Sequence, residues 1–448
     1  MVAQKFLDWA KSASPVERAE GAGLFAHAFL YNDLAEAERE EARLVLTALL
    51  DDSSPLVRRA MAENFAGAVN VPHYIVLTLA GDHPDIAAIV LARSPLLSDA
   101  ELVDCAATAD AFAQSAIALR PSVSAPVAAA LAEVGACEAL ISLAVNPGAE
   151  LLEFSIRRMI ERHGHHAGLR AALLARPNLS AALRSDLAGA AAKALSAIMT
   201  GYGRIVNEKA MSLTREACER ANVQIAAESA CEANGALSFV AHLRRSGQLT
   251  AGLLLRGLLC GNMHLLEAAL CELTGVPMAR VAGFVAEYKS AGFAALYSKA
   301  QMPERLLPAF VAGLEAVAKS RCGGPMNARL QLRLVTSVLE ACESVNRGEL
   351  DPLITSLRRL EAEAARDEAR DFCRAVASSV SGEAGLRWSP LALCGKNLPR
   401  ACRIRSAGKT EDASDSRRLH DRSGGFCGGT RGSLRLVEAS PGYGLTLT

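Results

Sequence analysis

Three histidines stand close together in the middle of the chain, and their density suggests metal binding. They are His163, His165 and His166. Zinc is bound by such imidazoles, but a closed zinc site needs four donors, and no cysteine or aspartate at a suitable spacing completes the set. The same segment can end a helix that begins near Leu151, with Gly164 in the left-handed conformation and the imidazoles at the negative end of the helix dipole. We favour the helix end and keep a metal-binding or catalytic role for the His163–His166 cluster as an alternative.

A second group with metal-binding side chains is Cys260, His264 and Cys271. Gly261 and Asn262 interrupt the helix between the first two, so no i, i+4 spacing places them on one face. Thiols on packed helices are more commonly small buried side chains. The sequence has no Cys-x-x-Cys pair, no Gly-x-Ser-x-Gly motif and no His-Glu-x-x-His motif. We therefore predict no cofactor, no metal ion and no enzymatic activity.

Arginines recur beside the predicted helix starts and could line one surface of the molecule. The candidates for this interaction ridge are Arg58, Arg59, Arg93, Arg120 and Arg176. A row of guanidinium groups could contact a protein partner or the phosphates of a nucleic acid. Residues 1–380, however, contain 37 basic and 42 acidic residues, a net charge of −5. This charge argues against nucleic-acid binding, which we keep as a further alternative.

The elements that position these side chains are predicted to be helices. Apolar residues make up 51% of the 448 residues, but aromatic residues make up only 4%. A composition in which alanine and leucine dominate the apolar residues favours close packing of helices over sheets. Because 448 residues exceed one compact core, the chain must form several domains or an extended array.

Helix starts recur through the first half of the chain. N-cap candidates precede Pro55, Pro84 and Pro147, and apolar residues follow each proline at helical spacing. Three starts of this kind indicate an array of short amphipathic helices.

A repeated motif gives this array a period. The segment Arg120–Ala125 matches Arg176–Ala181 in pattern, 56 residues later. The helix-start serines Ser98, Ser124 and Ser180 lie 26 and then 56 residues apart, close to one and two units of about 28 residues. Two short helices cannot bury an apolar face alone, so consecutive units must stack. We predict an all-α fold, with a HEAT-like α-α superhelix of helical hairpins over residues 1–190.

Beyond residue 190 the repeat disappears, but the helical pattern continues. Residues 191–320 are predicted to be a continuing helical domain with helices after Thr250, Asn262, Pro277 and Pro303, and residues 327–380 to be C-terminal helices. Residues 381–448 are rich in Gly, Ser and Arg and have no periodicity, so we predict a disordered tail. A reading-frame artefact of the gene sequence is a second explanation for this tail.

The body of the chain resembles a bacterial family known as domain of unknown function number 2336, whose members are predicted HEAT-like helical proteins. The residues that carry the resemblance are the helix starts 52–66 and 82–92, the Arg-Pro motifs at Arg120 and Arg176, and the segments 247–258, 266–270, 275–277 and 292–293. The resemblance covers roughly residues 20 to 320, and the segment 247–258 is its most specific part. It supports the helical architecture and implies no reaction, ligand or catalytic residue.

These observations together favour a protein that acts by making contacts. We predict a cytoplasmic helical-repeat scaffold or adaptor that binds another protein along its concave face. The N-terminus lacks the uninterrupted apolar core of a signal peptide, and the most apolar long window, residues 123–145, contains Glu133, Glu138 and Pro126. We therefore predict no export and no membrane partner, and the twelve scattered cysteines are expected to be reduced thiols.

Overall fold

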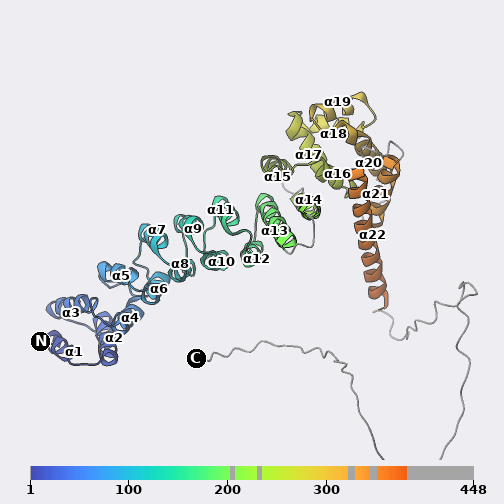
Figure 1. Ribbon diagram of the computed structural model, residues 1–448. Coiled ribbons are helices and arrows are strands. Elements are labelled where there is room, and N and C mark those ends of the chain that lie inside the picture. Colours follow the sequence, from blue (N-terminus) through green and yellow to red (C-terminus); the bar gives the residue numbers. More distant parts are fainter. Residues whose placement is uncertain (1, 202–206, 230–234, 321–327, 344–350, 381–448) are drawn as a thin grey trace, which may run out of the picture. The chain divides into compact units, whose positions relative to one another are not determined.

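The computed structural model describes residues 2–201, 207–229, 235–320, 328–343 and 351–380 (Figure 1). Within these residues the chain is all-α, as predicted, with 22 α-helices, one short 3-10 helix and no β-strand. Residues 1–380 form one compact unit. The predicted disordered tail, residues 381–448, lies outside the described residues.

Helices of the first half of the chain are mostly 8 to 17 residues long. They are α1 (Val2–Ala10), α2 (Pro15–Tyr31), α3 (Glu36–Leu49), α4 (Pro55–Phe65), α5 (His73–Ala80), α6 (Pro84–Arg93), α7 (Asp99–Thr108), α8 (Ala111–Ala118), α9 (Ala125–Val134), α10 (Cys137–Val145), α11 (Glu153–His163) and α12 (Ala167–Leu174).

The second half contains helices of more variable length. They are α13 (Ala181–Gly201), α14 (Asn207–Ser229), α15 (Gly235–Arg245), α16 (Ala251–Leu259), α17 (Met263–Thr274), α18 (Met278–Ala286), α19 (Ala291–Lys299), the 3-10 helix η1 (Glu304–Leu306), α20 (Leu307–Ser320), α21 (Ala328–Glu343) and α22 (Asp351–Val380).

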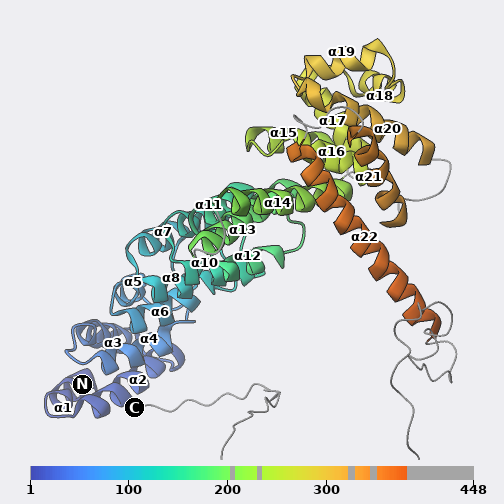
Figure 2. The same cartoon turned by 45° about the vertical axis from the view of Figure 1, so that its right-hand side comes forward.

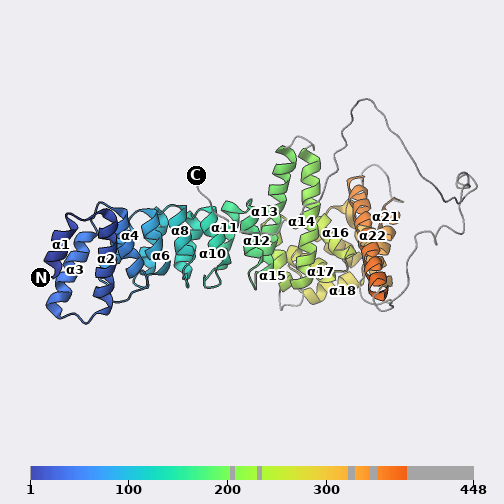
Figure 3. The same cartoon turned by 90° about the horizontal axis from the view of Figure 1, so that it is seen from below.

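Helices in the first half pack in two rows, in which most helices contact the helix two positions further along the chain. The even-numbered row runs α2, α4, α6, α8, α10 and α12, and the odd-numbered row runs α7, α9, α11 and α13. Both rows can be followed in Figure 1, and Figure 3 shows the even-numbered row side by side. Apolar side chains between the rows form one continuous core from Ala22 to Leu187.

Two of the three predicted proline starts are confirmed. Helix α4 begins at Pro55 and α6 at Pro84. The predicted start at Pro147 is wrong, because α11 begins only at Glu153. The residues between Pro147 and Glu153 pair with Val123 instead. The Val123 amide donates to the Gly148 carbonyl oxygen at 3.1 Å, and the Glu150 amide donates to the Val123 carbonyl oxygen at 2.9 Å. These bonds form a single parallel bridge, which holds the backbone extended.

Helix α13 belongs to both halves of the unit. Its residues Leu183 and Leu187 lie in the first core, whereas Ala181 packs against a second core that extends from Val223 to Leu360. Helices α13 and α14 form a long hairpin, which projects beyond the shorter helices in Figure 3. Helix α13 ends at Gly201 and α14 begins at Asn207, and the residues between them lie outside the described part of the chain. The predicted domain boundary at residue 190 falls inside α13.

Candidate functional site

Side chains that precede the repeat prolines form a ladder of hydrogen bonds along the even-numbered row. Arg120 donates to the carbonyl oxygens of Leu91 and Ser94 at 2.6 and 2.7 Å. Asn146 donates through Nδ2 to the carbonyl oxygens of Ala118 and Arg120 at 2.8 and 2.7 Å. We call this arrangement the x-Pro ladder, because Ser94, Arg120, Asn146 and Arg176 each stand immediately before a proline.

The last step of the x-Pro ladder is made by Arg176. Its guanidinium donates to the carbonyl oxygens of Ala144, Asn146 and Ala149, each at 3.0 Å. Every step therefore ends on the pre-proline residue of the preceding unit. Since the last turn of a helix leaves carbonyl oxygens without partners, these side chains satisfy the ends of α6, α8 and α10 while tying successive units together.

Arg58 makes a related link earlier in the chain. Its Nε and Nη2 donate to both carboxylate oxygens of Asp82 at 2.6 and 3.0 Å, and its Nη1 donates to the Asp52 carbonyl oxygen at 2.6 Å. The Asp52 carboxylate in turn accepts two bonds from Arg18, at 2.9 and 3.0 Å. The hydrogen bonds with Arg18 hold the pKa of Asp52 below its usual value. Paired bonds of this kind fix the relative position of two helices as well as attract them.

The five arginines of the predicted interaction ridge thus lie in different surroundings. Arg58, Arg120 and Arg176 direct their guanidinium groups to other parts of the chain. Arg59 forms an exposed ion pair with Glu63 at 2.9 Å, four residues along the same helix, and Arg93 is exposed at the end of α6. Three of the five guanidinium groups are thus engaged in contacts within the chain, and the interaction ridge stays a prediction.

The histidine segment ends α11 at His163, as predicted, but the predicted conformation of Gly164 is wrong. Gly164 has φ −61° and is right-handed. Glycine is needed here for another reason: a Cβ would lie 2.3 Å from the Ile160 carbonyl oxygen and 2.9 Å from the Ala190 Cβ. Burial lowers the pKa of His163, whereas His165 and His166 are exposed. Among the described residues, no group of three or more His, Cys, Asp or Glu is placed to hold a metal ion.

The second predicted group is also spread apart. Cys260 accepts a hydrogen bond from the Gln331 amide at 3.2 Å, and burial raises the pKa of its thiol. His264 is exposed and lies 3.6 Å from Glu267 on its own helix. Asn262 caps α17, as predicted, by accepting from the Leu265 amide at 3.1 Å.

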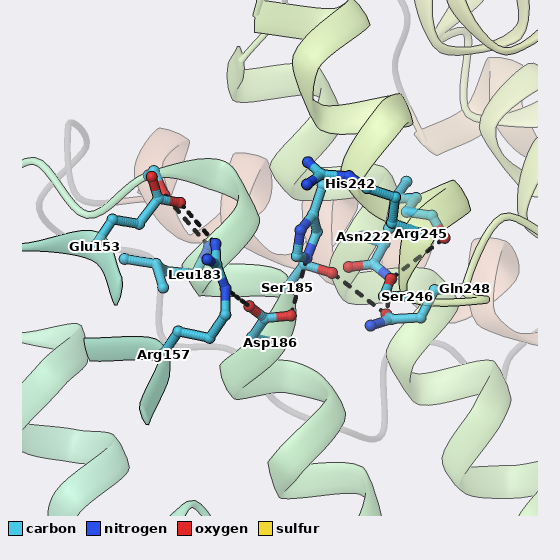
Figure 4. A network of polar contacts seen from close by, with 12 residues as sticks. Glu153, Arg157, Leu183, Ser185, Asp186, Asn222, His242, Arg245, Ser246 and Gln248 are labelled. Carbon is cyan, nitrogen blue, oxygen red and sulfur yellow. Dashed lines mark hydrogen bonds and ion pairs between the residues drawn. The ribbon is translucent and has the colours of Figure 1, made fainter. Parts of the chain in front are cut away.

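The segment 247–258, the most specific part of the resemblance, comprises the turn after α15 and most of α16. Within this turn, Gln248 binds α13 and α14. Gln248 accepts hydrogen bonds through Oε1 from Asn222 at 2.9 Å and from Ser185 at 3.3 Å (Figure 4). Gly247, immediately before it, has φ +68°, a left-handed conformation that ends α15 and that glycine adopts without strain. This turn therefore aims the amide of Gln248 into the junction between the two cores.

A second chain of contacts crosses the same junction. Asp186 on α13 lies 2.9 Å from Nε2 of the buried His242 on α15 and 3.6 Å from Nε of Arg157 on α11 (Figure 4). Arg157 also donates to Glu153 at 3.1 Å. Among the described residues, Asp186 is the one side chain that hydrogen-bonds His242. The contacts of Asp186 therefore join α11, α13 and α15.

The segment 250–256 faces α14 and α22 with further polar contacts. Thr250 caps α16 and donates to Glu219 Oε1 at 2.8 Å. Burial raises the pKa of the Glu219 carboxyl, although the hydrogen bond from Thr250 and the charge of Arg256 act in the opposite direction. Arg256 is only 6% exposed and donates to Glu363 of α22 at 2.8 Å. The pattern of the sequence did not reveal this ion pair, because its members lie 107 residues apart.

Large apolar side chains are exposed along the even-numbered row. Four of them on α8, α10 and α12, here called the apolar strip, are more than half exposed: Phe112, Leu119, Val145 and Leu174. Leu119, Val145 and Leu174 stand at the C-terminal ends of α8, α10 and α12, which pack consecutively. Large exposed apolar side chains on three successive helices favour a surface that another molecule covers. The sequence held one signal for the strip, since α8 has only Gln114 and Ser115 as polar residues and is apolar on nearly all sides.

No single helix in the described part of the chain is long and apolar enough to cross a membrane. The pair α17 and α18 passes such a test only when taken together, and the two helices are bent by 120° at their break. Their apolar residues Leu265, Leu266 and Leu270 lie in the second core.

Comparison with known proteins bears on the family of this chain. No curated protein and no solved structure matches it. One family model matches residues 86–347, which is more than half of the chain, and its match begins and ends later than the resemblance predicted from the sequence. The matched residues include the x-Pro ladder, the junction between the cores and Arg256. The chain therefore belongs to the family described as "Uncharacterised protein conserved in bacteria", DUF2336.

Proposed function

We propose that this chain is a HEAT-like helical-repeat adaptor that binds another protein in the cytoplasm and acts by binding rather than by catalysis. The observation that carries the proposal is the apolar strip of Phe112, Leu119, Val145 and Leu174. Helices that stack in rows present a long surface, and removal of exposed apolar side chains on such a surface from water favours association with a partner.

The contacts of Arg120 and Arg176 also favour the apolar strip as the binding surface. Arg120 and Arg176 use their guanidinium groups to hold neighbouring units together, so they are scaffold residues that position the strip. Nucleic-acid binding and a metal site at His163–His166 gain no comparable observation from the geometry. Elemental analysis of the purified protein tests the metal alternative directly, since stoichiometric zinc that is lost in His165→Ala would favour it over an adaptor.

Affinity capture from a bacterial lysate tests the adaptor, with the full chain, with a form lacking residues 381–448, and with single substitutions in the strip. We expect Leu119→Glu and Val145→Glu each to reduce recovery of a specific partner by about tenfold or more, because a buried charge opposes association at the centre of an interface. Phe372→Glu is the matched control, since Phe372 is similarly exposed but lies on α22, away from the strip. Equal recovery by all variants, or no partner under gentle conditions, would contradict the proposal.

A further inference from the structure

A cavity with both apolar and charged side chains in its walls lies among helices of the second half of the unit. Its volume is about 230 Å³, and its walls come from α14, the end of α16, α21 and α22. Figure 2 shows α16, α21 and α22 close together. The side chains on which the inference depends are Arg220, Arg256, Asn262, Gln331, Glu363 and Asp367.

One hydrogen-bond donor of this cavity is buried without an acceptor. It is the Nδ2 atom of Asn262, which has no partner among the described residues. Arg256 is almost completely buried and donates from Nη1 to Glu363. Within the described part of the chain, Gln331 donates to the Cys260 thiol, which is a weak acceptor. Buried donors without acceptors are costly, so a group with several acceptor oxygens would be stabilised here.

The two acidic side chains of the cavity come from outside the part of the chain that the family model matches. Glu363 and Asp367 belong to α22, whereas the match ends at residue 347 and includes Arg220, Arg256, Asn262 and Gln331. Within the matched residues the cavity is therefore a set of donors and positive charges. Glu363 stands where the carboxylate of a ligand would bind, 2.8 Å from Arg256, and Asp367 lies 3.6 Å from Arg220.

We propose that this cavity binds a small organic anion through its carboxylate or phosphate oxygens, and that Glu363 competes with the anion for Arg256. Arg256, Arg220 and Asn262 donate to the anion, while α22 moves its carboxylate away. The volume supports a small ligand, because it is below the range of roughly 300–1,000 Å³ that is usual for drug-sized ligands. This inference concerns another part of the molecule than the apolar strip and stands whether or not the adaptor function is correct.

Titration calorimetry on the full chain, with inorganic phosphate and with malonate as separate probes, tests the proposal. We expect the wild type to bind at least one probe, and Glu363→Gln to bind it about tenfold more tightly, because the competing charge is removed. Asn262→Asp should bind it about tenfold or more weakly, because a donor becomes a negative charge. This variant keeps the oxygen that caps the Leu265 amide, so the helix start is preserved. Preference for phosphate or malonate identifies the oxygen group that the cavity selects.

The matched control is Glu361→Gln on the same helix. Glu361 accepts a hydrogen bond from Thr336 and does not line the cavity, so this variant should bind like the wild type. The proposal is overturned if neither the wild type nor Glu363→Gln binds either probe at up to about 10 mM. It is also overturned if Asn262→Asp leaves binding unchanged, or if Glu361→Gln strengthens it as much as Glu363→Gln does. Circular dichroism of each variant confirms that the helices are intact.

Discussion

Single residues before proline determine how neighbouring units are held in register. Arg120, Asn146 and Arg176 have different side chains, yet each donates to backbone carbonyl oxygens of the preceding unit. Proline favours an extended conformation in the residue before it, so each of these side chains leaves its helix end in the same direction. The position relative to proline, rather than the residue type, is therefore what the three units share.

Substitution of Asn146 tests the x-Pro ladder. Asn146→Ala removes two hydrogen bonds to carbonyl oxygens and the bond from the Gly148 amide to Oδ1. We expect the free energy of unfolding of the first half to fall by about 1–3 kcal/mol. Asn146→Asp should lower this free energy of unfolding further, because its carboxylate would face two carbonyl oxygens. Urea unfolding followed by circular dichroism measures both, and Ser142→Ala is the control, since its hydroxyl bonds only within its own helix. An Asn146→Asp variant as stable as wild type would contradict the ladder.

The sequence indicates which residues matter more reliably than it indicates their roles. The repeated Arg-Pro motif marks Arg120 and Arg176, but it does not group Asn146 with them, since an amide and a guanidinium look unrelated in a sequence. Gly164 is correctly placed at a helix end, yet the reason for glycine is the close approach of Ala190, which lies 26 residues further along the chain. Arg256 lies in the segment 247–258 that carries the resemblance, but its ion pair could not be predicted, because its partner Glu363 is distant in sequence.

Helices and turns are the scale at which the sequence is most informative. Capping residues such as Ser98 and Thr250 and the prolines at the starts of α4 and α6 act within one helical turn, so their effect can be predicted locally. Pro147 does not start a helix, because a bridge to Val123 in the preceding unit holds this segment extended. Such a contact depends on how units stack and leaves no local signature.

Gly148 provides a test at the scale of this turn. A Cβ at this position would lie 2.0 Å from the Pro121 carbonyl oxygen, which is backbone and cannot turn aside. We expect Gly148→Ala to lower the stability of the first half by about 1–3 kcal/mol, as overpacking does. Thermal and urea unfolding measure the loss. Gly67→Ala is the control, because nothing lies within 4 Å of the position that its added methyl group would occupy, and it should be close to neutral. A neutral Gly148→Ala would show that the bridge is dispensable.

On the scale of the whole unit, two apolar cores meet at α13 through polar side chains. Leu131 lies in the first core and Leu265 in the second. The links across the junction include the contact of Asp186 with His242 and the bonds to Gln248. Stacked units of this kind gain stability chiefly from their nearest neighbours, so a change in one core should weaken it more than the other.

Hydrogen exchange measured by mass spectrometry tests this separation. Leu131→Ala removes a fully buried side chain from α9 and should lower the free energy of unfolding by about 2–5 kcal/mol. We expect amide protection to fall across α7–α11 and to remain near the wild-type level across α15–α19. Leu265→Ala should give the reverse pattern. A uniform loss of protection in both variants would show that the two cores unfold as one.

The x-Pro ladder has a direction. Each donor, such as Asn146 or Arg176, follows its acceptors in the chain by 26 to 32 residues. A nascent polypeptide leaves the ribosome amino end first, so each new pre-proline side chain of the ladder finds its acceptor oxygens already exposed on the unit made before it. The ladder can therefore form in step with translation, whereas Arg58 and the Val123 amide must wait for the later oxygens of Asp82 and Gly148.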